Sequence, residues 1–417
     1  MECNPVQLSK VITSIATGPF GSNLKVSCFV DSGFPVIDGA NLKGLKLTDN
    51  LTKFVTKEKA ESLARSIAKR GDVVVTISGT LGQIAYIPED SLYPEYLCSQ
   101  RQFKVSFDQE KVYVPYLVYY FHTREGQSKI LSFANQTGVP ALAQPTKNFQ
   151  KIEVGLPTLE EQKRIVKVAE LLTAKMELNQ QINGYLEELC DALFLDYLER
   201  ADSSWHEGTL EELAEVKYGK DHKKLADGPY PVYGSGGFMR SAEKSLFSGE
   251  SVLIPRKGSL NNVMYVNGAF WTVDTMFFTV PRIAGAAKFL YQYVKRLDLA
   301  SMNSGSAVPS MTISILNALS LPVPPRDSLL SFNAKLQSMY DAVRANNLEN
   351  RRLESLRDSL LPKLMAGEID VSKIDLTQLN SHLAANLSNW HWHRVVNRHI
   401  RQVETEAWLC APWLFCH

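Results

Sequence analysis

A short polar run at the end of an apolar stretch is the first place in this sequence that could do chemistry. A strand-like pattern ends at Pro255, and Arg256, Lys257, Gly258 and Ser259 follow it. A guanidinium group can donate two hydrogen bonds to guanine, an ammonium group meets phosphate, and glycine lets a backbone approach closely. The run is therefore a candidate for nucleic-acid contact, and a solvated basic turn is the alternative.

Three further polar segments carry side chains of the same kinds. Hydroxyl, amide and guanidinium groups can read base edges, whereas lysines on phosphates position a protein without specifying sequence. The alternatives are a hairpin turn that needs glycine, the polar outer face of a strand at residues 100–105, and a solvated basic loop. The candidates are Ser78, Thr80 and Gln83 in the first segment, Gln100 and Arg101 in the second, and Lys220, Lys223 and Lys224 in the third.

Other polar and aromatic groups are better explained by structure than by binding. Residues 135–137 and 303–306 are predicted to form turns, with base-reading loops as the alternative. The aromatic residues at 119–121 and those at 291 and 293 sit in helical patterns, which favours core packing over base stacking.

No recognisable catalytic motif accompanies these candidates. The sequence lacks a G-x-x-x-x-G-K-[ST] phosphate loop, an H-E-x-x-H pair and an Asn-Pro-Pro-Tyr type motif. Glu161-Gln162-Lys163 has a Glu-x-Lys spacing found in nucleases, but it lies at a predicted helix start with no Pro-Asp before it. The sequence therefore predicts a binding protein without an active site or a metal site of its own.

An internal repeat organises the chain and must position these candidates. One matching pair of segments could arise by chance, but four pairs in the same order indicate a duplicated block. The pairs are residues 34–37 with 230–233, 71–80 with 249–259, 137–142 with 306–311, and 152–157 with 319–324.

A long helical pattern follows each copy of the repeat. Its apolar residues alternate in spacing between three and four, as in a coiled-coil seam, and its length of about 35 residues exceeds that of an ordinary globular helix. A plain helix packed on a domain core is the alternative. Lys175 and Asn179 interrupt the first seam, and Asn346 and Asn350 interrupt the second. The predicted seam residues are Ile165, Val168, Leu172, Ile182, Leu186 and Leu189 in the first helix, and Leu336, Met339, Val343, Leu353 and Leu360 in the second.

The order block, helix, block, helix requires the two helices to run antiparallel if they pair. Thirty-five residues extend roughly 50 Å at about 1.5 Å each. That length corresponds to about 15 base pairs at the 3.4 Å rise of B-DNA. The sequence thus predicts an α/β fold class with two structurally similar domains, related by a pseudo-twofold axis and separated by a long antiparallel two-helix coiled coil.

Composition is compatible with this layout and sets a few limits. The 417 residues suggest two or three domains, and no apolar run is long enough to span a bilayer. Residues 1–155 hold 17 Lys and Arg against 14 Asp and Glu, residues 203–325 hold 12 against 10, and residues 156–202 hold 5 against 10. Two mildly basic blocks permit polyanion binding without demanding it. Six scattered cysteines and a start without a signal-like pattern indicate a reduced, cytoplasmic protein.

Several segments resemble the specificity subunits of type I restriction-modification systems. Residues 155–162 (GLPTLEEQ) resemble the entry of the family's central conserved helix, and residues 356–369 (LRDSLLPKLMAGEI) resemble the exit of its distal conserved helix. Residues 230–237 (YPVYGSGG) and 270–275 (FWTVDT) are similar to pieces of its target-recognition domains. The resemblance covers about residues 1–372. One departure is that Arg326-Asp327-Ser328 stands where the second helix entry would have Glu-Glu-Gln.

The resemblance implies a DNA-recognition subunit without catalysis of its own. It implies target-recognition domains at 1–157 and 203–325, a central helix at 158–202 and a distal helix at 326–368. Each domain would read one half of a bipartite double-stranded DNA site. The helices would dock methyltransferase subunits, two being expected, and these would engage the restriction subunits. S-adenosylmethionine, ATP and magnesium are expected on those partners.

The segment 369–417 does not match the family and is expected to be an atypical extension. It carries five of the eight histidines and four of the six tryptophans, but the spacing of His391, His393, Cys410 and Cys416 fits no zinc motif. Two alternatives to the main hypothesis remain open: a coiled-coil scaffold that binds no nucleic acid, and a silent recombination variant that no longer assembles.

Overall fold

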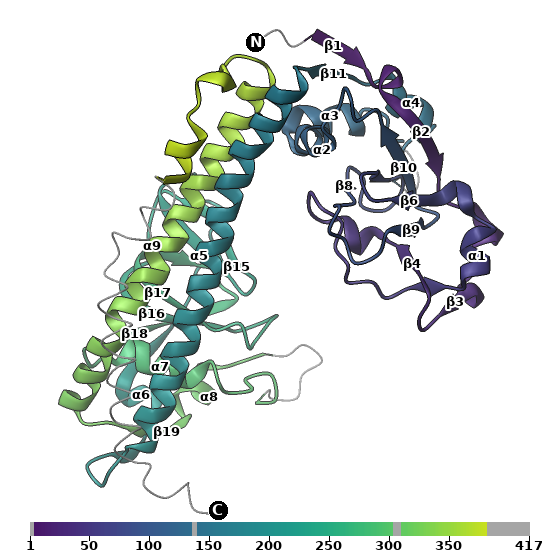
Figure 1. Cartoon of the computed structure of the whole chain (residues 1–417). Coiled ribbons are helices and arrows are strands. Elements are labelled where there is room, and N and C mark those ends of the chain that lie inside the picture. The colour runs from purple at the N-terminus through teal and green to yellow at the C-terminus, as the bar shows by residue number, and fades with distance from the viewer. Residues whose placement is uncertain (1–3, 136–139, 303–309, 382–417) are drawn as a thin grey trace, which may run out of the picture. The chain divides into compact units, whose positions relative to one another are not determined.

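The computed structural model describes residues 4–135, 140–302 and 310–381 and divides into two compact units. One unit takes in the chain up to Glu177 and again from Glu349, and the other is Leu178–Leu348. Each unit contains one α/β domain and a part of each of two long helices (Figure 1).

The domain of the first unit is built on a pair of strands and two larger sheets. Its central strand, β7, is rich in β-branched residues and is buried throughout, as a strand covered on both faces requires. The pair is β1 (Asn4–Gln7) with β11 (Glu153–Leu156). The four-stranded sheet has the order β2 (Ile12–Thr17), β10 (Gln102–Phe107), β7 (Val73–Thr76), β8 (Ile84–Tyr86). The five-stranded sheet has the order β3 (Phe29–Val30), β5 (Phe54–Val55), β4 (Phe34–Ile37), β9 (Glu95–Cys98), β6 (Ile67–Lys69).

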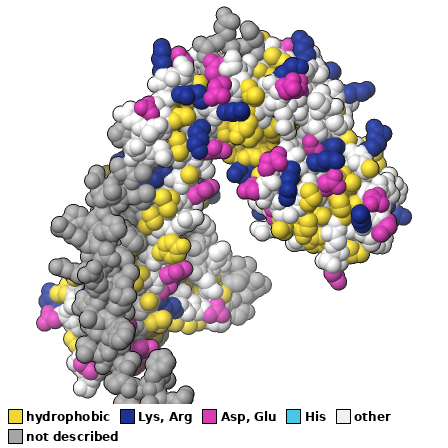
Figure 2. Space-filling view, viewed as in Figure 1, with side chains coloured by type: hydrophobic (Ala, Val, Ile, Leu, Met, Phe, Trp, Pro, Cys, Tyr) yellow, Lys and Arg dark blue, Asp and Glu magenta, His cyan; other side chains and the backbone are white. Residues whose placement is uncertain are grey.

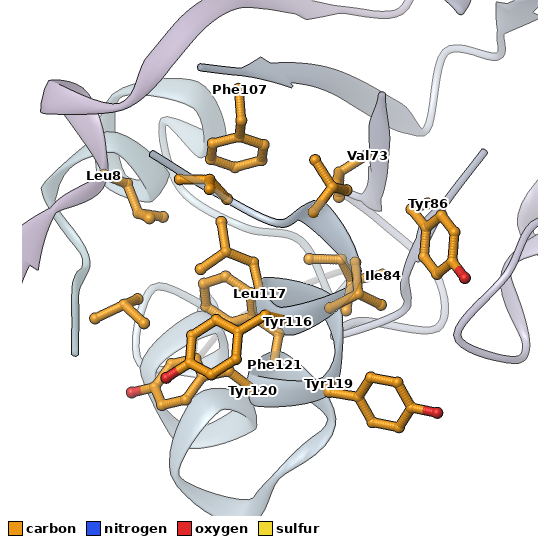
Figure 3. Close-up of a cluster of buried hydrophobic side chains, with 14 of the residues drawn as sticks. Leu8, Val73, Ile84, Tyr86, Phe107, Tyr116, Leu117, Tyr119, Tyr120 and Phe121 are labelled. Carbon is orange, nitrogen blue, oxygen red and sulfur yellow. The ribbon is translucent and has the colours of Figure 1, made fainter. Parts of the chain in front are cut away.

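Helix α2 (Val114–His122) supplies four of the eight buried aromatic residues in the main core of this domain. Pro115 lies in its first turn, where the missing N–H costs no hydrogen bond. Figure 3 shows its Tyr116, Leu117 and Phe121 side chains facing Ile84 and Phe107 from the sheet. The core-packing prediction for residues 119–121 is therefore confirmed, since all three are buried. The remaining helices of the domain are α1 (Lys57–Glu61), α3 (Arg124–Leu131) and α4 (Pro145–Lys151).

The domain of the second unit repeats this plan with one larger sheet. The small pair is β12 (His206–Thr209) with β19 (Ser320–Val323). The six-stranded sheet has the order β13 (Ala214–Tyr218), β18 (Met276–Pro281), β16 (Phe247–Pro255), β17 (Met264–Thr272), β14 (Tyr230–Gly234), β15 (Gly237–Ala242). Its helices are α6 (Leu210–Leu213), α7 (Ala286–Val294) and α8 (Ile313–Asn317).

Matching backbone hydrogen bonds show that the two domains share one fold. In each domain a glycine directly after a long strand (β2 or β13) donates a backbone hydrogen bond to the neighbouring strand (β10 or β18). Each domain also contains one parallel strand pair, β4 with β9 in the first and β14 with β17 in the second. The matching bonds are Gly18 N to Gln102 O (2.8 Å) with Gly219 N to Met276 O (2.9 Å), Ser99 N to Ile37 O (3.3 Å) with Val273 N to Tyr233 O (3.0 Å), and Leu142 N to Ile77 O (2.9 Å) with Met311 N to Arg256 O (3.0 Å). The predicted pair of similar α/β domains is confirmed.

Two helices of 41 and 40 residues, α5 (Leu159–Glu199) and α9 (Arg326–Met365), belong to both units. Both are longer than the predicted length of about 35 residues. Capping hydrogen bonds fix where α5 begins and where α9 ends. Thr158 and Glu161 form a capping box before α5, with Thr158 N donating to Glu161 Oε2 at 3.0 Å and Glu161 N donating to Thr158 Oγ1 at 3.3 Å. After α9, Gly367 takes a φ of 75° and Glu368 N closes back onto Lys363 O at 2.9 Å.

The two helices pair in antiparallel fashion, and polar residues belong to the contact. In the first unit, buried Lys175 forms an ion pair with Glu349 at 3.5 Å. In the second unit, Asn183 donates to Asn347 Oδ1 at 3.0 Å and accepts from Asn346 at 2.8 Å. Higher numbers on α5 meet lower numbers on α9, so the antiparallel prediction is confirmed. Lys175 and Asn179, which interrupt the apolar pattern, are both buried and therefore lie within the seam.

The position of one predicted seam residue is wrong. Leu189 is 38% exposed, whereas its neighbour Cys190 is buried and lies 3.7 Å from Met339 Sδ. At 3.6 residues per turn the buried stripe runs through Asn183, Leu186, Cys190 and Phe194, one residue away from Leu189. Of the other predicted seam residues, Ile165, Val168, Leu172, Leu186, Leu336, Met339 and Leu353 are buried, and Ile182, Val343 and Leu360 are partly buried.

The described residues lack both a membrane-spanning helix and a metal-binding cluster. None of their helices combines the length and apolar character that a bilayer span requires. They also hold no group of three or more His, Cys, Asp or Glu side chains placed to share a metal ion. The histidines and cysteines singled out at residues 391, 393, 410 and 416 lie outside the part of the chain that the structure describes, as does the extension beyond residue 381.

Candidate nucleic-acid interface

One edge of the first domain brings together the turns that carry its candidate residues. Ile77 N donates to Arg101 O at 2.6 Å, which joins the β7–β8 turn to the β9–β10 turn. An isolated bridge between Ser78 and Ala141 adds the segment that follows residue 140. Gly79 requires glycine because its φ is 94°, and a Cβ there would lie 3.8 Å from the Arg101 guanidinium. Ser78, Thr80 and Arg101 are therefore neighbours.

The structure divides these candidates into exposed groups and bracing groups. Thr80 and Arg101 are exposed, and Ser78 is half-buried. Gln83 accepts a hydrogen bond from Thr76 Oγ1 at 3.2 Å, so its amide helps to hold the β7–β8 turn. Gln100 Nε2 donates to Gly21 O and Leu24 O, both at 2.8 Å, and so holds the neighbouring loop 18–24.

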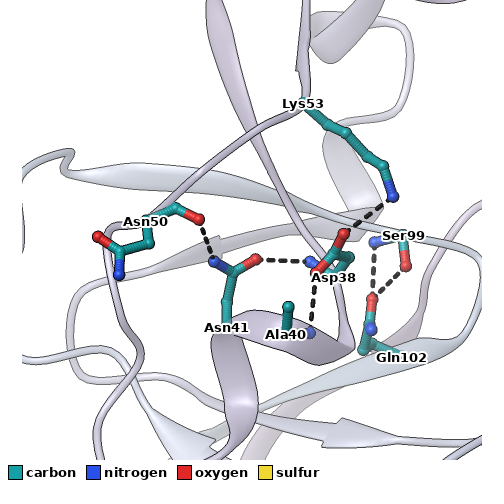
Figure 4. Close-up of polar contacts among 7 residues, drawn as sticks. All are labelled: Asp38, Ala40, Asn41, Asn50, Lys53, Ser99 and Gln102. Carbon is teal, nitrogen blue, oxygen red and sulfur yellow. Dashed lines mark hydrogen bonds and ion pairs between the residues drawn. The ribbon is translucent and has the colours of Figure 1, made fainter. Parts of the chain in front are cut away.

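The prediction that the polar residues at 100–102 all face outward is wrong at Gln102. Its side chain is 1% exposed and accepts from Ser99 N at 3.0 Å (Figure 4). The cause is the tight turn at 99–101, which needs an internal acceptor for its own amide. Strand alternation alone could not reveal this requirement.

A second polar network braces the loop that follows β4. Asn41 is nearly fully buried and donates to Thr48 O and Asn50 O, both at 3.1 Å. Lys53 forms an ion pair with Asp38 at 2.9 Å, as Figure 4 shows. Partial burial would raise the pKa of Asp38, but the hydrogen bonds from Lys53 and from Ala40 N outweigh it and lower that pKa. The sequence patterns did not single out these residues.

The equivalent edge of the second domain carries Arg256, which is half-buried. Its guanidinium lies 5.4 Å from the centroid of the Tyr218 ring and donates to Asp274 O at 3.3 Å. Arg256 N also donates to Thr275 O at 2.8 Å, so both ends of the residue are held. A guanidinium has five N–H donors, so this arrangement orients the group and leaves donors for a ligand.

The turn after Arg256 presents Lys257 and Ser259, both of which are exposed. Gly258 takes a φ of 84°, and a Cβ there would come within 2.9 Å of Ser235 Oγ, so only glycine fits. Asn262 Nδ2 donates to Ser235 O at 2.7 Å and ties this turn to the β14–β15 hairpin. The turn is therefore rigid at its base while its tip faces solvent.

The basic loop at 220–224 lies against the same edge. Lys220 N donates to Thr272 O at 2.9 Å, and Lys220 O accepts from the Trp271 indole at 2.8 Å. Lys223 and Lys224 are exposed. Lys223 N donates to the Asp221 carboxylate at 3.0 Å, and this backbone hydrogen bond lowers the pKa of Asp221. The loop thus offers three ammonium groups and one carboxylate.

Acidic residues are sparse in the sequence segments that build both edges, and Asp221 and Asp274 are the ones named above at the second edge. In the first domain, residues 18–26, 77–83, 99–102 and 140–144 contain no Asp or Glu. In the second domain, residues 228–242 and 251–273 contain none. Elsewhere the charges are mixed: Figure 2 shows Lys and Arg interspersed with Asp and Glu over the visible face of the first domain. Both edges therefore suit a polyanion without forming one large basic patch.

The turns predicted at residues 135–137 and 303–306 fall almost wholly outside the described residues. Only Asn135 of these is described, and its N–H donates to Ala141 O at 2.8 Å.

Comparison with known proteins gives a consistent result. A family model for the type I restriction modification DNA specificity domain matches twice, at residues 21–188 and 202–356. The type I restriction enzyme MjaIX specificity subunit of Methanocaldococcus jannaschii is 20% identical over 77% of this chain and 82% of its own length. The HindI specificity subunit of Haemophilus influenzae is 31% identical over a shorter stretch, 22% of this chain and 21% of its own length. A crystal structure of a type I S subunit from M. genitalium has a TM-score of 0.54 at 17% identity and covers 87% of this chain and 96% of that chain.

Proposed function

The chain belongs to the type I restriction modification DNA specificity family, and we propose that it reads the DNA target for a type I restriction-modification complex. Each of its two domains reads one half of a bipartite duplex site. The observation that carries this proposal is the same edge in both domains, built on matching hydrogen bonds and on segments that are poor in acidic residues. Two copies of one DNA-reading surface are what recognition of two short half-site sequences requires.

The reading residues differ between the copies, which is what two different half-sites require. The first domain offers Thr80 and Arg101, and the second offers Arg256, Lys257 and Ser259. Arg256 is the strongest base-reading candidate, because the Tyr218 ring and Asp274 O orient its guanidinium. Lys220, Lys223 and Lys224 are candidates for phosphate contacts, which fix register and carry no sequence information.

The long helices are proposed to bind partner subunits and to set the distance between the two half-sites. On α5, Tyr185 is 64% exposed and Leu189 is 38% exposed, which leaves apolar surface for a methyltransferase subunit. At about 1.5 Å per residue, α5 is roughly 60 Å long, or about 18 base pairs of B-DNA, and this length limits the unread spacer.

Methyl transfer and cleavage are assigned to partner subunits in this proposal. S-adenosylmethionine, ATP and magnesium accordingly act there, with the chain acting as a reader and scaffold. Docking of two methyltransferase subunits, and of restriction subunits through them, belongs to the same proposal.

Selection of duplexes from a random pool by the full chain, co-expressed with a methyltransferase subunit from its own host, tests this function. The expected result is two short conserved blocks separated by unselected bases, with affinity that falls steeply as salt rises. If the protein selects no preferred duplex, and any residual DNA affinity does not change with salt, the result would instead favour a scaffold that does not recognise DNA.

A further inference from the structure

An exposed phenylalanine stands on the same edge of the first domain as Arg101. Phe20 is 77% exposed, and Val26, at 86%, is the only large apolar side chain that exceeds it among the described residues. Loop 18–24 carries it, and Gln100 attaches that loop to the β9–β10 turn. Single exposed apolar side chains are common on protein surfaces, so the inference depends on the place of this ring at a candidate binding edge and on the loop that holds it.

The loop holds Phe20 in a fixed position. Gly18 N donates to Gln102 O at 2.8 Å, and a Cβ on Gly18 would lie 1.8 Å from Ser99 O, so the backbone is pressed against the turn. Asn23 N donates to Phe20 O at 2.9 Å, and Leu24 is buried beneath the loop. The ring therefore projects from a braced base and does not sit on a loose segment.

The surroundings of Phe20 suit a nucleic acid better than a protein surface or a membrane. Lys25 and Arg101 are exposed nearby, and no Asp or Glu occurs between Ile12 and Val30 in the sequence. A single ring beside cationic groups is the arrangement by which minor-groove proteins insert a wedge between base pairs while they neutralise phosphates.

We propose that Phe20 inserts between two base pairs of the half-site bound by the first domain and unstacks them. This inference rests on the proposed DNA-reading function and adds deformation of the duplex to it. Part of the sequence preference would then come from how easily a base step opens, and steps of pyrimidine followed by purine open most readily.

The second domain presents apolar groups at its own edge in a similar way. Phe238 is 56% exposed and Met239 is 53% exposed at the start of β15. Their hairpin is tied to the Arg256 turn through Asn262 and Ser235 O at 2.7 Å. The Phe238 ring also lies 6.4 Å from the Tyr233 ring, which supports it from the strand side.

The test compares Phe20→Ala, Phe20→Leu and Leu92→Ala in the full chain with its methyltransferase partner. Leu92 is the matched control because it is 66% exposed in the same domain but precedes β9, whereas the candidate turn follows β9. The probe is the duplex selected by the unaltered protein, with 2-aminopurine placed in turn at each position of the first half-site. Its fluorescence rises when a base is unstacked.

The unaltered protein should raise the fluorescence at one base step of that half-site. Phe20→Ala should abolish this rise and weaken binding by about 10- to 100-fold, in line with the usual effect of losing one stacked aromatic. Phe20→Leu should retain most of both effects, since leucine also serves as a wedge, and Leu92→Ala should change neither.

Two negative results are distinguishable. If the unaltered protein selects a duplex and Phe20→Ala binds it with the same affinity and the same fluorescence, the wedge is refuted and the proposed function stands. If the unaltered protein selects no duplex at all, the proposed function fails and takes the wedge with it.

Discussion

Lys288 on α7 gives the sharpest prediction for the second unit, because its charge is completely buried. Its side chain is 0% exposed, and its ammonium group donates to Glu250 Oε1 at 2.5 Å, Asn333 Oδ1 at 2.9 Å and Gln337 Oε1 at 2.8 Å. All three ammonium protons are therefore used. Asn333 and Gln337 belong to α9, so the cluster attaches the domain to the long helix within this unit.

Lys288→Met keeps an unbranched side chain, one atom shorter than that of lysine, and removes its charge. It leaves the Glu250 carboxylate with the Tyr265 hydroxyl at 2.5 Å and leaves two amide oxygens facing a thioether. Breaking a buried ion pair on one side usually costs about 3–5 kcal/mol. Because the Glu250 side chain is 26% exposed, we expect the lower end of that range, about 3 kcal/mol.

Hydrogen exchange followed by mass spectrometry measures this loss locally. Peptides from β16, β17 and α7 should exchange roughly 100-fold faster in Lys288→Met, since 1.4 kcal/mol corresponds to about a factor of ten. Lys295→Met is the matched control, because the Lys295 side chain is 19% exposed and its partner Asp191 is 41% exposed. A surface pair of that kind contributes about 0–1 kcal/mol.

The double variant Lys288→Met with Glu250→Gln should recover part of the loss, since no charge is then left unpaired. If Lys288→Met exchanges no faster than Lys295→Met, the buried ion pair does not hold the domain to α9 and the reasoning is refuted.

Three further predictions concern the reactivity of the cysteines, the reading of bases by Arg256 and the length of the unread spacer. Burial raises the pKa of Cys98 and that of Cys190 to about 12, so peptide mapping after iodoacetamide treatment should show Cys28 labelled before either of them, and equal labelling of the three would contradict the burial. Arg256→Lys keeps the charge but loses the guanidinium fork, so affinity for the selected duplex should fall by roughly 10- to 100-fold in a competition assay, and an unchanged affinity would remove Arg256 from the reading surface. Adding one heptad to both α5 and α9 should lengthen the unread spacer in methylome sequencing and leave both half-sites alone, whereas altered half-sites with an unchanged spacer would count against the spacing role.

The repeat and the helices were predictable from sequence because both depend on short-range pattern. Apolar spacing of three and four predicts a paired helix wherever it occurs, and the matched Leu142 and Met311 segments make the same hydrogen bond in both domains. The phase of the first seam was harder to read. The spacing at Leu189 fitted the pattern as well as that at Cys190, and only the packing against Met339 distinguishes them.

The candidate interface was predictable only in part, because exposure and bracing depend on contacts that are distant in sequence. Gln100 has the same side chain whether it reads a base or holds a loop, and its acceptors Gly21 and Leu24 are more than 70 residues away. Phe20 was missed for the opposite reason. An isolated aromatic residue between Pro19 and Gly21 suggests a turn, and nothing in the local sequence indicates that the ring faces solvent.

In the proposed function, each domain reads its half-site independently of the other. Replacement of residues 203–325 by the equivalent block of another family member, followed by duplex selection with the assembled complex, tests it most directly. One conserved block of the selected site should change while the other block keeps its sequence. A change in both blocks, or in neither, would contradict it.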